Sequence, residues 1–206
     1  MPTLDHEVRL QTAGAHTIAG IDEVGRGCWA GPVVAAAVVL HPDAFADPIA
    51  LHGIDDSKRL SAVQREILVP RIHALALGVG IGSVPAFLID ALGIVRATHL
   101  AMELALLQLP LVPDTLLIDA VQLAGSARRQ KALIGGDHLS YSIAAASIIA
   151  KTARDRRMAE LDGDAPRYGF AQHKGYGTRA HEAALKRWGP CVEHRRSFRP
   201  LWNEEV

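Results

Sequence analysis

Ile21-Asp22-Glu23-Val24-Gly25-Arg26-Gly27 is the most informative stretch of the chain, because two adjacent acids end an apolar run and a Gly-Arg-Gly turn follows them. Carboxylates at the end of a strand are good ligands for hard divalent metal ions. Glycines let the backbone approach a ligand closely, and an arginine between them can pair with a phosphate. Metal, close backbone and phosphate together indicate phosphodiester chemistry.

The bulk properties describe an ordinary soluble protein. The 206 residues are long enough for one sizeable core, and they are 49% hydrophobic and 21% charged. The two cysteines, Cys28 and Cys191, do not form a C-x-x-C pair, which argues against a cysteine-built zinc site or a disulfide framework. We see no signal peptide, and the apolar run 33–40 is too short to span a bilayer. A cytoplasmic protein is expected, with a monomer as the default.

Charge is balanced over the whole chain but unevenly distributed along it. Residues 151–200 carry 12 basic and 6 acidic side chains, although the net charge of the protein is zero. A neutral chain is no general polyanion binder. An acidic first part followed by a basic C-terminal part suits a metal-dependent nuclease, although solvated helix faces would give the same pattern.

The chain is predicted to alternate strands and helices. Strands are expected at 17–21, 33–40, 78–84, 115–118 and 131–134. Helices are expected at 62–77 after an N-cap at Ser61, at 85–109 with a break near Gly93, from Ser140 or Ser142 to 161, and at 179–188. This order predicts an α/β fold with a mixed sheet covered by helices. The turn to basic composition near 162–166 divides a catalytic domain, 1–162, from a C-terminal region, 163–206.

Four acids are candidates for one metal site: Asp22, Glu23, Asp119 and Asp137. Asp22 and Asp119 each end an apolar strand, and neighbouring strand ends can bring them together. Because successive side chains alternate between the faces of a strand, Glu23 requires a local bend to face the same site, or contributes differently. Asp137 follows two glycines and precedes a helix, and taken alone it would equally suit a turn or a cap.

The clustered carboxylates need cations, because they would otherwise repel one another and raise some pKa values. Two divalent ions would balance the charge and organise an in-line displacement, and oxygen ligands favour Mg²⁺ or Mn²⁺ over zinc. Asp155 is too far along the helix to join them and is expected to pair at the surface with Arg154, Arg156 or a nearby basic residue. The ten histidines show no ligand-like cluster.

Blocks of sequence from about residue 18 to 200 then point to a family. They are Asp-Glu-Val-Gly-Arg-Gly at 22–27 with Ala-Gly-Pro-Val-Val-Ala-Ala-Ala at 30–37, Asp-Ser-Lys-Arg-Leu-Ser at 56–61, Leu-Ile-Asp at 117–119, Gly-Asp at 136–137 with Ser-Ile-Ala-Ala-Ala-Ser-Ile-Ile-Ala-Lys at 142–151, Tyr-Gly-Phe at 168–170, His-Lys-Gly-Tyr-Gly-Thr at 173–178 and His-Arg-Arg-Ser-Phe at 194–198. In this order they resemble bacterial type 2 ribonuclease H (ribonuclease HII), whose members hydrolyse the RNA strand of RNA–DNA hybrids.

The resemblance implies an RNase H-like fold, with a five-stranded mixed sheet, flanking helices and a small C-terminal helical region. It implies that Asp22, Glu23, Asp119 and Asp137 are the catalytic, metal-binding acids of a two-metal endonuclease that leaves 3′-hydroxyl and 5′-phosphate ends. Gly25-Arg26-Gly27 would then sense the ribose 2′-hydroxyl, and Tyr176 would pack against the nucleotide at an RNA–DNA junction. Cleavage 5′ of a single ribonucleotide in duplex DNA is expected.

The remaining substrate contacts are expected from basic side chains, which position a duplex through its phosphates. The candidates are Arg26, Lys58, Lys174, Arg195 and Arg196. Three positions depart from the family pattern: Cys28-Trp29 replaces a common Pro-Leu, Ala120 replaces a common glycine, and Gly135 replaces a frequent lysine. The first two indicate packing changes, and the third removes a phosphate contact.

Two other functions fit part of the pattern. Another nuclease or an integrase-like phosphotransferase would use carboxylates at the same strand ends, but it would not need the Gly-Arg-Gly turn or the Lys-Gly-Tyr-Gly-Thr segment. A hybrid- or duplex-binding protein with a dead site would not need all four acids, and all four are present.

Overall fold

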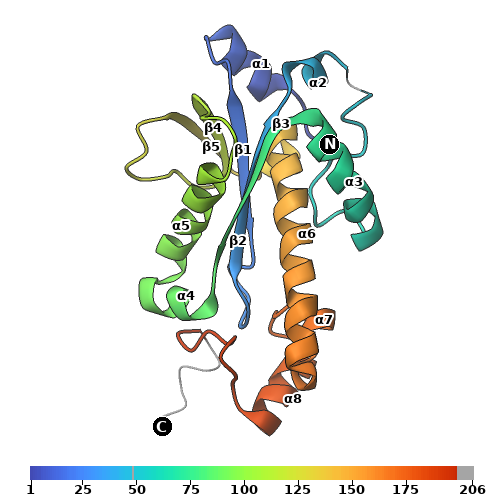
Figure 1. Ribbon diagram of the computed structural model, residues 1–206, viewed down its shortest axis with the longest axis vertical. Helices are drawn as coiled ribbons and strands as arrows, with labels where there is room; N and C mark the ends of the chain where they lie inside the picture. The colour runs from blue at the N-terminus through green and yellow to red at the C-terminus, as the bar shows by residue number, and fades with distance from the viewer. Residues whose placement is uncertain (48, 199–206) are drawn as a thin grey trace.

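A mixed five-stranded sheet forms the centre of the computed structural model, which describes residues 1–47 and 49–198 (Figure 1). The strands are β1 (Ile18–Val24), β2 (Val33–Leu40), β3 (Ala76–Val84), β4 (Thr115–Asp119) and β5 (Arg129–Leu133). Their order across the sheet is β3-β2-β1-β4-β5. β1, β2 and β3 pair antiparallel, whereas β4 runs parallel to both β1 and β5. The predicted mixed sheet is confirmed.

Helices cover both faces of this sheet. They are α1 (Asp5–Thr12), α2 (Pro42–Ala46), α3 (Ala62–Leu75), α4 (Ala86–Leu92), α5 (Ile94–Leu107), α6 (Tyr141–Asp164), α7 (Phe170–His173) and α8 (Arg179–Trp188), with 3₁₀ turns at Gly136–His138 and Pro166–Tyr168. In Figure 1, α4 and α5 lie on one side of the sheet, and α3 and α6 lie on the other. The long helix α6 continues downward to α7 and α8.

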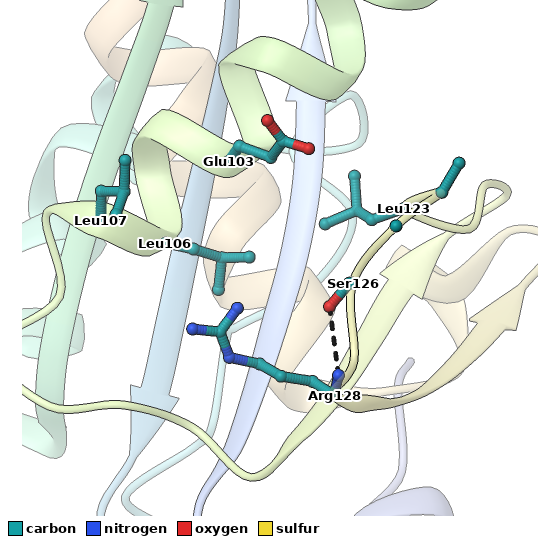
Figure 2. A pocket seen from close by; sticks show the side chains of 8 residues that line it. Glu103, Leu106, Leu107, Leu123, Ser126 and Arg128 are labelled. Carbon is teal, nitrogen blue, oxygen red and sulfur yellow. Dashed lines mark hydrogen bonds between the residues drawn. The ribbon is translucent and has the colours of Figure 1, made fainter.

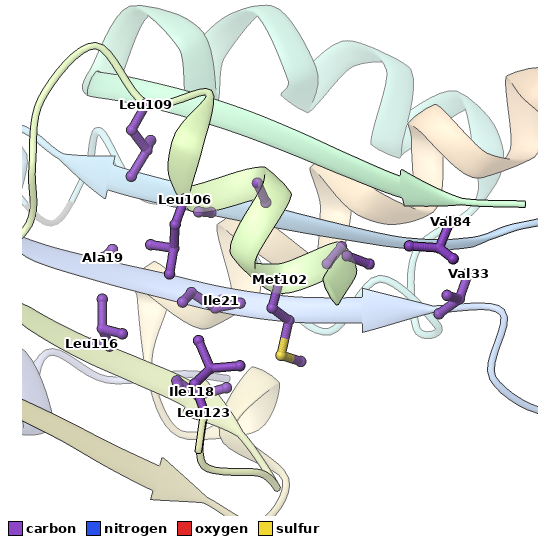
Figure 3. Close-up of a cluster of buried hydrophobic side chains, with 14 of the residues drawn as sticks. Ala19, Ile21, Val33, Val84, Met102, Leu106, Leu109, Leu116, Ile118 and Leu123 are labelled. Atoms are coloured by element: carbon purple, nitrogen blue, oxygen red, sulfur yellow. The ribbon is translucent and has the colours of Figure 1, made fainter. Parts of the chain in front are cut away.

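Two buried clusters hold the layers together. Between the sheet and α5, Ile21 and Ile118 pack with Met102 and Leu106 (Figure 3). On the other face, the valines and alanines of β2 pack against α3 and against the alanine-rich first half of α6. A strand buried on both faces has no reason to alternate apolar and polar residues, which explains the continuous apolar run at 33–40.

Glycines in the strands let the helices come unusually close. A Cβ on Gly20 of β1 would lie 2.1 Å from the carbonyl carbon of Ser142, at the start of α6. On β3, Cβ atoms at Gly80 and Gly82 would each lie 2.0 Å from a carbonyl oxygen of α5. The alternating glycines of β3 are therefore required for helix packing.

Helix ends follow the sequence signals closely. Ser61 caps α3 in a reciprocal capping box with Gln64. Of the two serines considered for the start of α6, Ser140 is the cap, because its side chain accepts the N–H of Ile143. The break near Gly93 separates α4 from α5 as predicted.

The helix α1 was not predicted, since its face toward the protein is largely polar. Its Glu7 is buried and accepts hydrogen bonds from Ser140 Oγ at 2.6 Å and Ser142 N at 2.9 Å. A carboxylate at the N-terminus of α6 is favoured by the helix dipole and by the free N–H groups there. Tertiary contact therefore stabilises a helix that lacks an apolar stripe.

The C-terminal region has a core of its own at the end of α6. Met158 and Leu161 of α6 pack with Tyr168, Phe170 and Leu185. The helix runs on to Asp164, across the predicted boundary after residue 162, and the division into 1–162 and 163–206 stays a prediction. Within residues 1–47 and 49–198, no helix is long and apolar enough to cross a membrane.

The close approach of α6 to β1 can be tested at Gly20. We expect Gly20→Ala to lower the free energy of unfolding by about 3 kcal/mol, because backbone atoms of α6 occupy the Cβ position. Urea unfolding measures the change. Gly163→Ala in α6 is the control. A Cβ at this position would meet nothing within 4 Å, so the higher helix propensity of alanine should raise the free energy of unfolding by up to about 1 kcal/mol. Equal effects of the two substitutions would contradict the packing argument.

Candidate active site

Asp22 and Asp119 lie on neighbouring strands at the same edge of the sheet. β1 and β4 are parallel, and their last paired residues are Ile21 and Ile118, so the two acids come next on each strand. Gly20 of β1 contacts α6, and alternation places Asp22 on that face as well. Ser147 of α6 is a near neighbour of Asp22, and its hydroxyl donates to Ser57 Oγ at 2.7 Å. The structure therefore brings these two predicted acids together under α6.

Asp137 joins them from the 3₁₀ turn that precedes α6. The N–H of Gly136 donates to Asp119 Oδ1 at 2.7 Å, which fixes this turn against the end of β4. Asp137 is buried, and its Oδ2 lies 3.4 Å from Lys58 Nζ. Burial lowers the pKa of Lys58, but the carboxylates of Asp137, Asp22 and Asp56 outweigh it and hold the pKa above its usual value.

Glu23 reaches the site without the bend expected from the sequence. Pairing between β1 and β2 is regular from Ala19 to Val24, so Glu23 lies on the face opposite Asp22. The paired part of β4 ends before it, and the two faces meet at this open edge. Glu23 Oε1 accepts from Arg26 Nη1 at 3.3 Å, whereas its Oε2 is buried without a hydrogen-bond partner. Of the two alternatives for Glu23, the regular pairing argues against a bent strand and favours a different contribution to the site.

The acids repel one another in a setting that excludes water. Burial, with the charges of Glu23 and Asp119, raises the pKa of Asp22 well above its usual value. Burial also raises the pKa of Glu23; Arg26 opposes this shift and Asp119 adds to it. The unpartnered Glu23 Oε2 and the all-oxygen donor set fit a hard divalent cation, as expected for Mg²⁺ or Mn²⁺.

Two further side chains extend the acidic cluster beyond the predicted set. Ligand atoms of Asp56, Asp137 and His138 all lie within 4.8 Å of one another. Asp56 is buried and accepts the N–H of Lys58 at 2.9 Å, and His138 Nε2 lies 3.6 Å from Asp56 Oδ2. Asp56 heads the Asp-Ser-Lys block, where sequence reasoning selected only the lysine. The adjacency of His138 to Asp137 was the available signal for the histidine.

The Gly-Arg-Gly turn lies beside the tyrosine segment, although about 150 residues separate them in the chain. Trp29 N donates to Gly175 O at 2.8 Å. Tyr176 lies beside the thiol of buried Cys28 and remains 43% exposed. An exposed aromatic ring next to an open turn is well placed to stack on a nucleotide.

A cluster of three histidines packs against the Tyr176 segment, and sequence reasoning missed this cluster. The rings of His173 and His181 stack with centroids 4.3 Å apart, and His181 Nε2 lies 3.0 Å from His194 Nε2. His181 Nδ1 lies 3.0 Å from the carbonyl oxygen of Tyr176. Burial lowers the pKa of both His181 and His194 to about 4, so both are neutral at neutral pH. Their nitrogens are occupied by these internal contacts, which makes the cluster structural.

The predicted phosphate contacts are only partly accessible. Arg196 is exposed, and Lys174 is half-buried with Nζ 3.4 Å from Asp155 O. Arg195 is a correction: its side chain is fully buried and donates to Gly31 O and Arg26 O, so it cannot reach a phosphate. Arg195 instead stabilises the Gly25-Arg26-Gly27 turn through these buried hydrogen bonds.

Two other expectations need refinement. Asp155 pairs with nearby basic residues, as one of the alternatives allowed, but they are Arg65 at 3.1 Å and Lys151 at 2.6 Å, and Asp155 is half-buried rather than at the surface. Ala120 is not a simple packing change, because its φ of +55° is a conformation that favours glycine. Trp29 does fit the packing interpretation, since its ring fills the space where Gly177 would carry a Cβ.

A separate pocket of about 470 Å³ lies between α5 and the loop that joins β4 to β5. Leu106 and Leu107 line one side, and Arg128, whose N–H donates to Ser126 Oγ, lies on the other (Figure 2). None of the four acids lines this pocket.

The raised pKa of Asp22 predicts a pH-dependent cost in the metal-free protein. The pKa of Asp22 in the folded protein lies above the ordinary value of 3.8. The free energy of unfolding therefore falls as pH rises from about 3.8 to the folded-state pKa. We expect Asp22→Asn to be more stable than wild type at neutral pH, on the order of 1–3 kcal/mol, and similar in acid. Urea unfolding in chelator over a pH series measures this. Asp43→Asn, which changes a side chain that is 91% exposed, is the control. A difference in the free energy of unfolding between wild type and Asp22→Asn that does not change with pH would contradict this account.

Comparisons with known proteins agree with this geometry. The chain matches the family model of ribonuclease HII over residues 19–205. It is 58% identical to ribonuclease HII of Chloroflexus aurantiacus, over 98% of this chain and 95% of that protein. It is 52% identical to the Geobacillus thermodenitrificans enzyme, over 95% of this chain and 73% of that protein.

Solved structures agree on the fold. Ribonuclease H2 from Pyrococcus horikoshii superposes with a TM-score of 0.75 at 23% identity, covering 91% of this chain and 96% of that one. The ribonuclease HII crystallised with PCNA from Archaeoglobus fulgidus gives a TM-score of 0.71 at 26% identity, covering 89% and 95%. The expected RNase H-like fold is confirmed. The chain therefore belongs to the ribonuclease HII family of metal-dependent endonucleases.

Proposed function

We propose that the protein hydrolyses the RNA strand of RNA–DNA hybrids, and that it also cleaves 5′ of a single ribonucleotide in duplex DNA, leaving 3′-hydroxyl and 5′-phosphate ends. The observation that carries this proposal is the joint position of the acids and the sensor. Asp22 and Asp119 end adjacent parallel strands, and two residues beyond Glu23 the chain enters the turn that contacts the Tyr176 segment.

The four acids would hold the metal ions, with Asp22, Asp119 and Asp137 under α6 and Glu23 at the open edge. Two divalent ions bound there would supply an activated water and neutralise the leaving 3′-oxygen. Lys58 contacts Asp137 and holds its carboxylate in place. We also propose that the protein acts as a monomer, because the acids need no residue from a second copy.

The turn offers free hydrogen-bond donors to a ribose. Within the described part of the chain, neither the N–H of Arg26 nor that of Gly27 donates to another protein group. A Cβ at Gly27 would meet no atom within 4 Å, so the surface above this residue is open. The 2′-hydroxyl distinguishes RNA from DNA at a given position. The Gly25-Arg26-Gly27 turn is therefore our candidate for reading it.

Tyr176 would define the junction by stacking on the neighbouring nucleotide, while exposed and half-buried basic groups track the phosphates. Lys174 and Arg196 lie in the basic C-terminal part of the chain, and Lys58 lies at the acids. Contacts to phosphates position a duplex without reading its sequence. The protein would then select ribose rather than a base sequence.

The deciding assay uses three duplexes: DNA with one ribonucleotide, a long RNA–DNA hybrid and all-DNA. With Mg²⁺ or Mn²⁺, we expect nicks 5′ of the ribonucleotide and throughout the hybrid, and none in chelator or in all-DNA. Equal nicking of all-DNA would favour a general nuclease or phosphotransferase. Binding without metal-dependent cleavage would favour a hybrid-binding protein.

Asp119→Asn serves as the matched loss of a single charge in this assay. Cleavage should fall by about a thousandfold or more, because the site loses a charged ligand, while hybrid binding is retained. Asp43→Asn removes an exposed carboxylate elsewhere and should leave the rate unchanged. Full activity in Asp119→Asn would remove this residue from the site.

Tyr176→Ala should affect the single-ribonucleotide duplex most. Loss of one base–aromatic stack costs about 1–3 kcal/mol, which is roughly a 5- to 150-fold drop in kcat/KM on that duplex. Long hybrids offer many binding registers and should suffer less. Tyr176→Phe keeps the ring and should keep most of the selectivity. An equal loss on both substrates in Tyr176→Ala would refute the junction role.

A further inference from the structure

Arg154 of α6 is a fully buried cation without a carboxylate partner among the described residues. All of its hydrogen bonds go to backbone carbonyls. Nε donates to Pro32 O at 2.9 Å, Nη2 to Ala30 O at 3.1 Å and Nη1 to Lys174 O at 2.8 Å. A guanidinium is planar and presents its donors in a rigid fork, so three such bonds fix their acceptors relative to one another.

These acceptors belong to two segments that the proposed function uses separately. Ala30 and Pro32 follow the Gly-Arg-Gly turn, whereas Lys174 lies two residues before Tyr176. The Cζ of Arg154 also lies 6.0 Å from the centroid of the Tyr176 ring. One side chain therefore connects the backbone of both parts of the candidate sensor and lies near the tyrosine ring.

Glycines at the contacts show how closely the two segments are drawn in. A Cβ on Gly25 would lie 2.2 Å from Arg154 Nε, so the turn rests directly on the guanidinium. A Cβ on Gly175 would lie 2.3 Å from the carbonyl oxygen of Ala30, one of the atoms that Arg154 binds. Glycine is required at both positions for the segments to meet.

We propose that Arg154 is a positioning residue that sets the separation between the Gly25-Arg26-Gly27 turn and Tyr176, and thereby the preference for an RNA–DNA junction. This role rests on the proposed function and deepens it. Arg195 is also buried, but its acceptors, Gly31 O and Arg26 O, both belong to the first segment. Arg195 therefore shapes the turn alone, whereas Arg154 spans the two segments.

The readout is a ratio: kcat/KM on the single-ribonucleotide duplex divided by kcat/KM on a long hybrid. Both values come from one preparation, so a smaller folded fraction lowers them equally and leaves the ratio unchanged. Arg154→Lys keeps the charge but loses the fork. We expect the ratio to fall by about tenfold or more, because displaced groups no longer meet the junction together. Cleavage of the long hybrid should fall by a smaller factor than cleavage of the single-ribonucleotide duplex, because a long hybrid offers many binding registers.

Arg156→Lys is the control for this substitution. It lies on the same helix, is exposed and pairs with Glu66, and it touches neither segment. Its ratio should equal that of wild type.

A second variant changes the separation without altering Arg154. Gly175→Ala places a methyl group against Ala30 O and pushes the segments apart, so the ratio should fall by a similar factor, about tenfold. Gly189→Ala is its control: the residue has a comparable positive φ, +68° against +81°, but its Cβ would meet nothing within 4 Å. This pair tests the proposal even where Arg154→Lys does not fold.

An unchanged ratio in folded Arg154→Lys or in Gly175→Ala, with wild type active on both duplexes, would overturn the positioning role alone. A ratio that falls equally in a variant and its control would also overturn it. A wild-type protein that cleaves the long hybrid but not the single-ribonucleotide duplex would instead overturn the proposed junction function and, with it, the role built on that function.

Discussion

The parallel contact between β1 and α6 places nearly every candidate functional group. The helix begins against Gly20 at Ser142, and Arg154 lies against Gly25. Twelve residues of α6 rise about 18 Å and five residues of β1 span about 17 Å, so the two elements run side by side over the same distance. Ser147 meets Asp22 between these two points. A single pair of elements thus carries Asp22, Glu23, the turn and the support beneath the turn.

Charge is separated along this pair. The strand ends gather carboxylates, where burial and the neighbouring acids raise the pKa values of Asp22 and Glu23. The following turn covers two buried guanidiniums, those of Arg154 and Arg195, which bind only backbone carbonyls. Among the described residues these carboxylates and the two guanidiniums do not pair with each other, although only a few residues of β1 separate them. Buried charges of this kind destabilise a fold unless other groups offset them. Carbonyl dipoles offset the guanidiniums, and divalent cations would offset the acids when bound.

Sequence reasoning recovered what depends on local pattern. The strand positions, the caps at Ser61 and Ser140, and the placing of Asp22 and Asp119 at strand ends all follow from runs of apolar residues and their boundaries. It failed where a distant contact decides. The helix α1 depends on Glu7 binding the start of α6, and the burial of Arg195 depends on carbonyls more than 160 residues away. A basic side chain in a polar segment gives no local signal that it is buried.

The region under Tyr176 shows how a departure from the family pattern can be absorbed. The thiol of Cys28 lies beside the Tyr176 side chain, and the Trp29 ring centroid lies 5.5 Å from that of His181, which in turn contacts Tyr176 O. Because burial keeps His181 and His194 neutral at neutral pH, this support carries no charge that could compete for phosphate. Cys28 and Trp29 therefore lie next to the Tyr176 segment and away from the acids, so under the proposed function they would bear on substrate choice more directly than on catalysis.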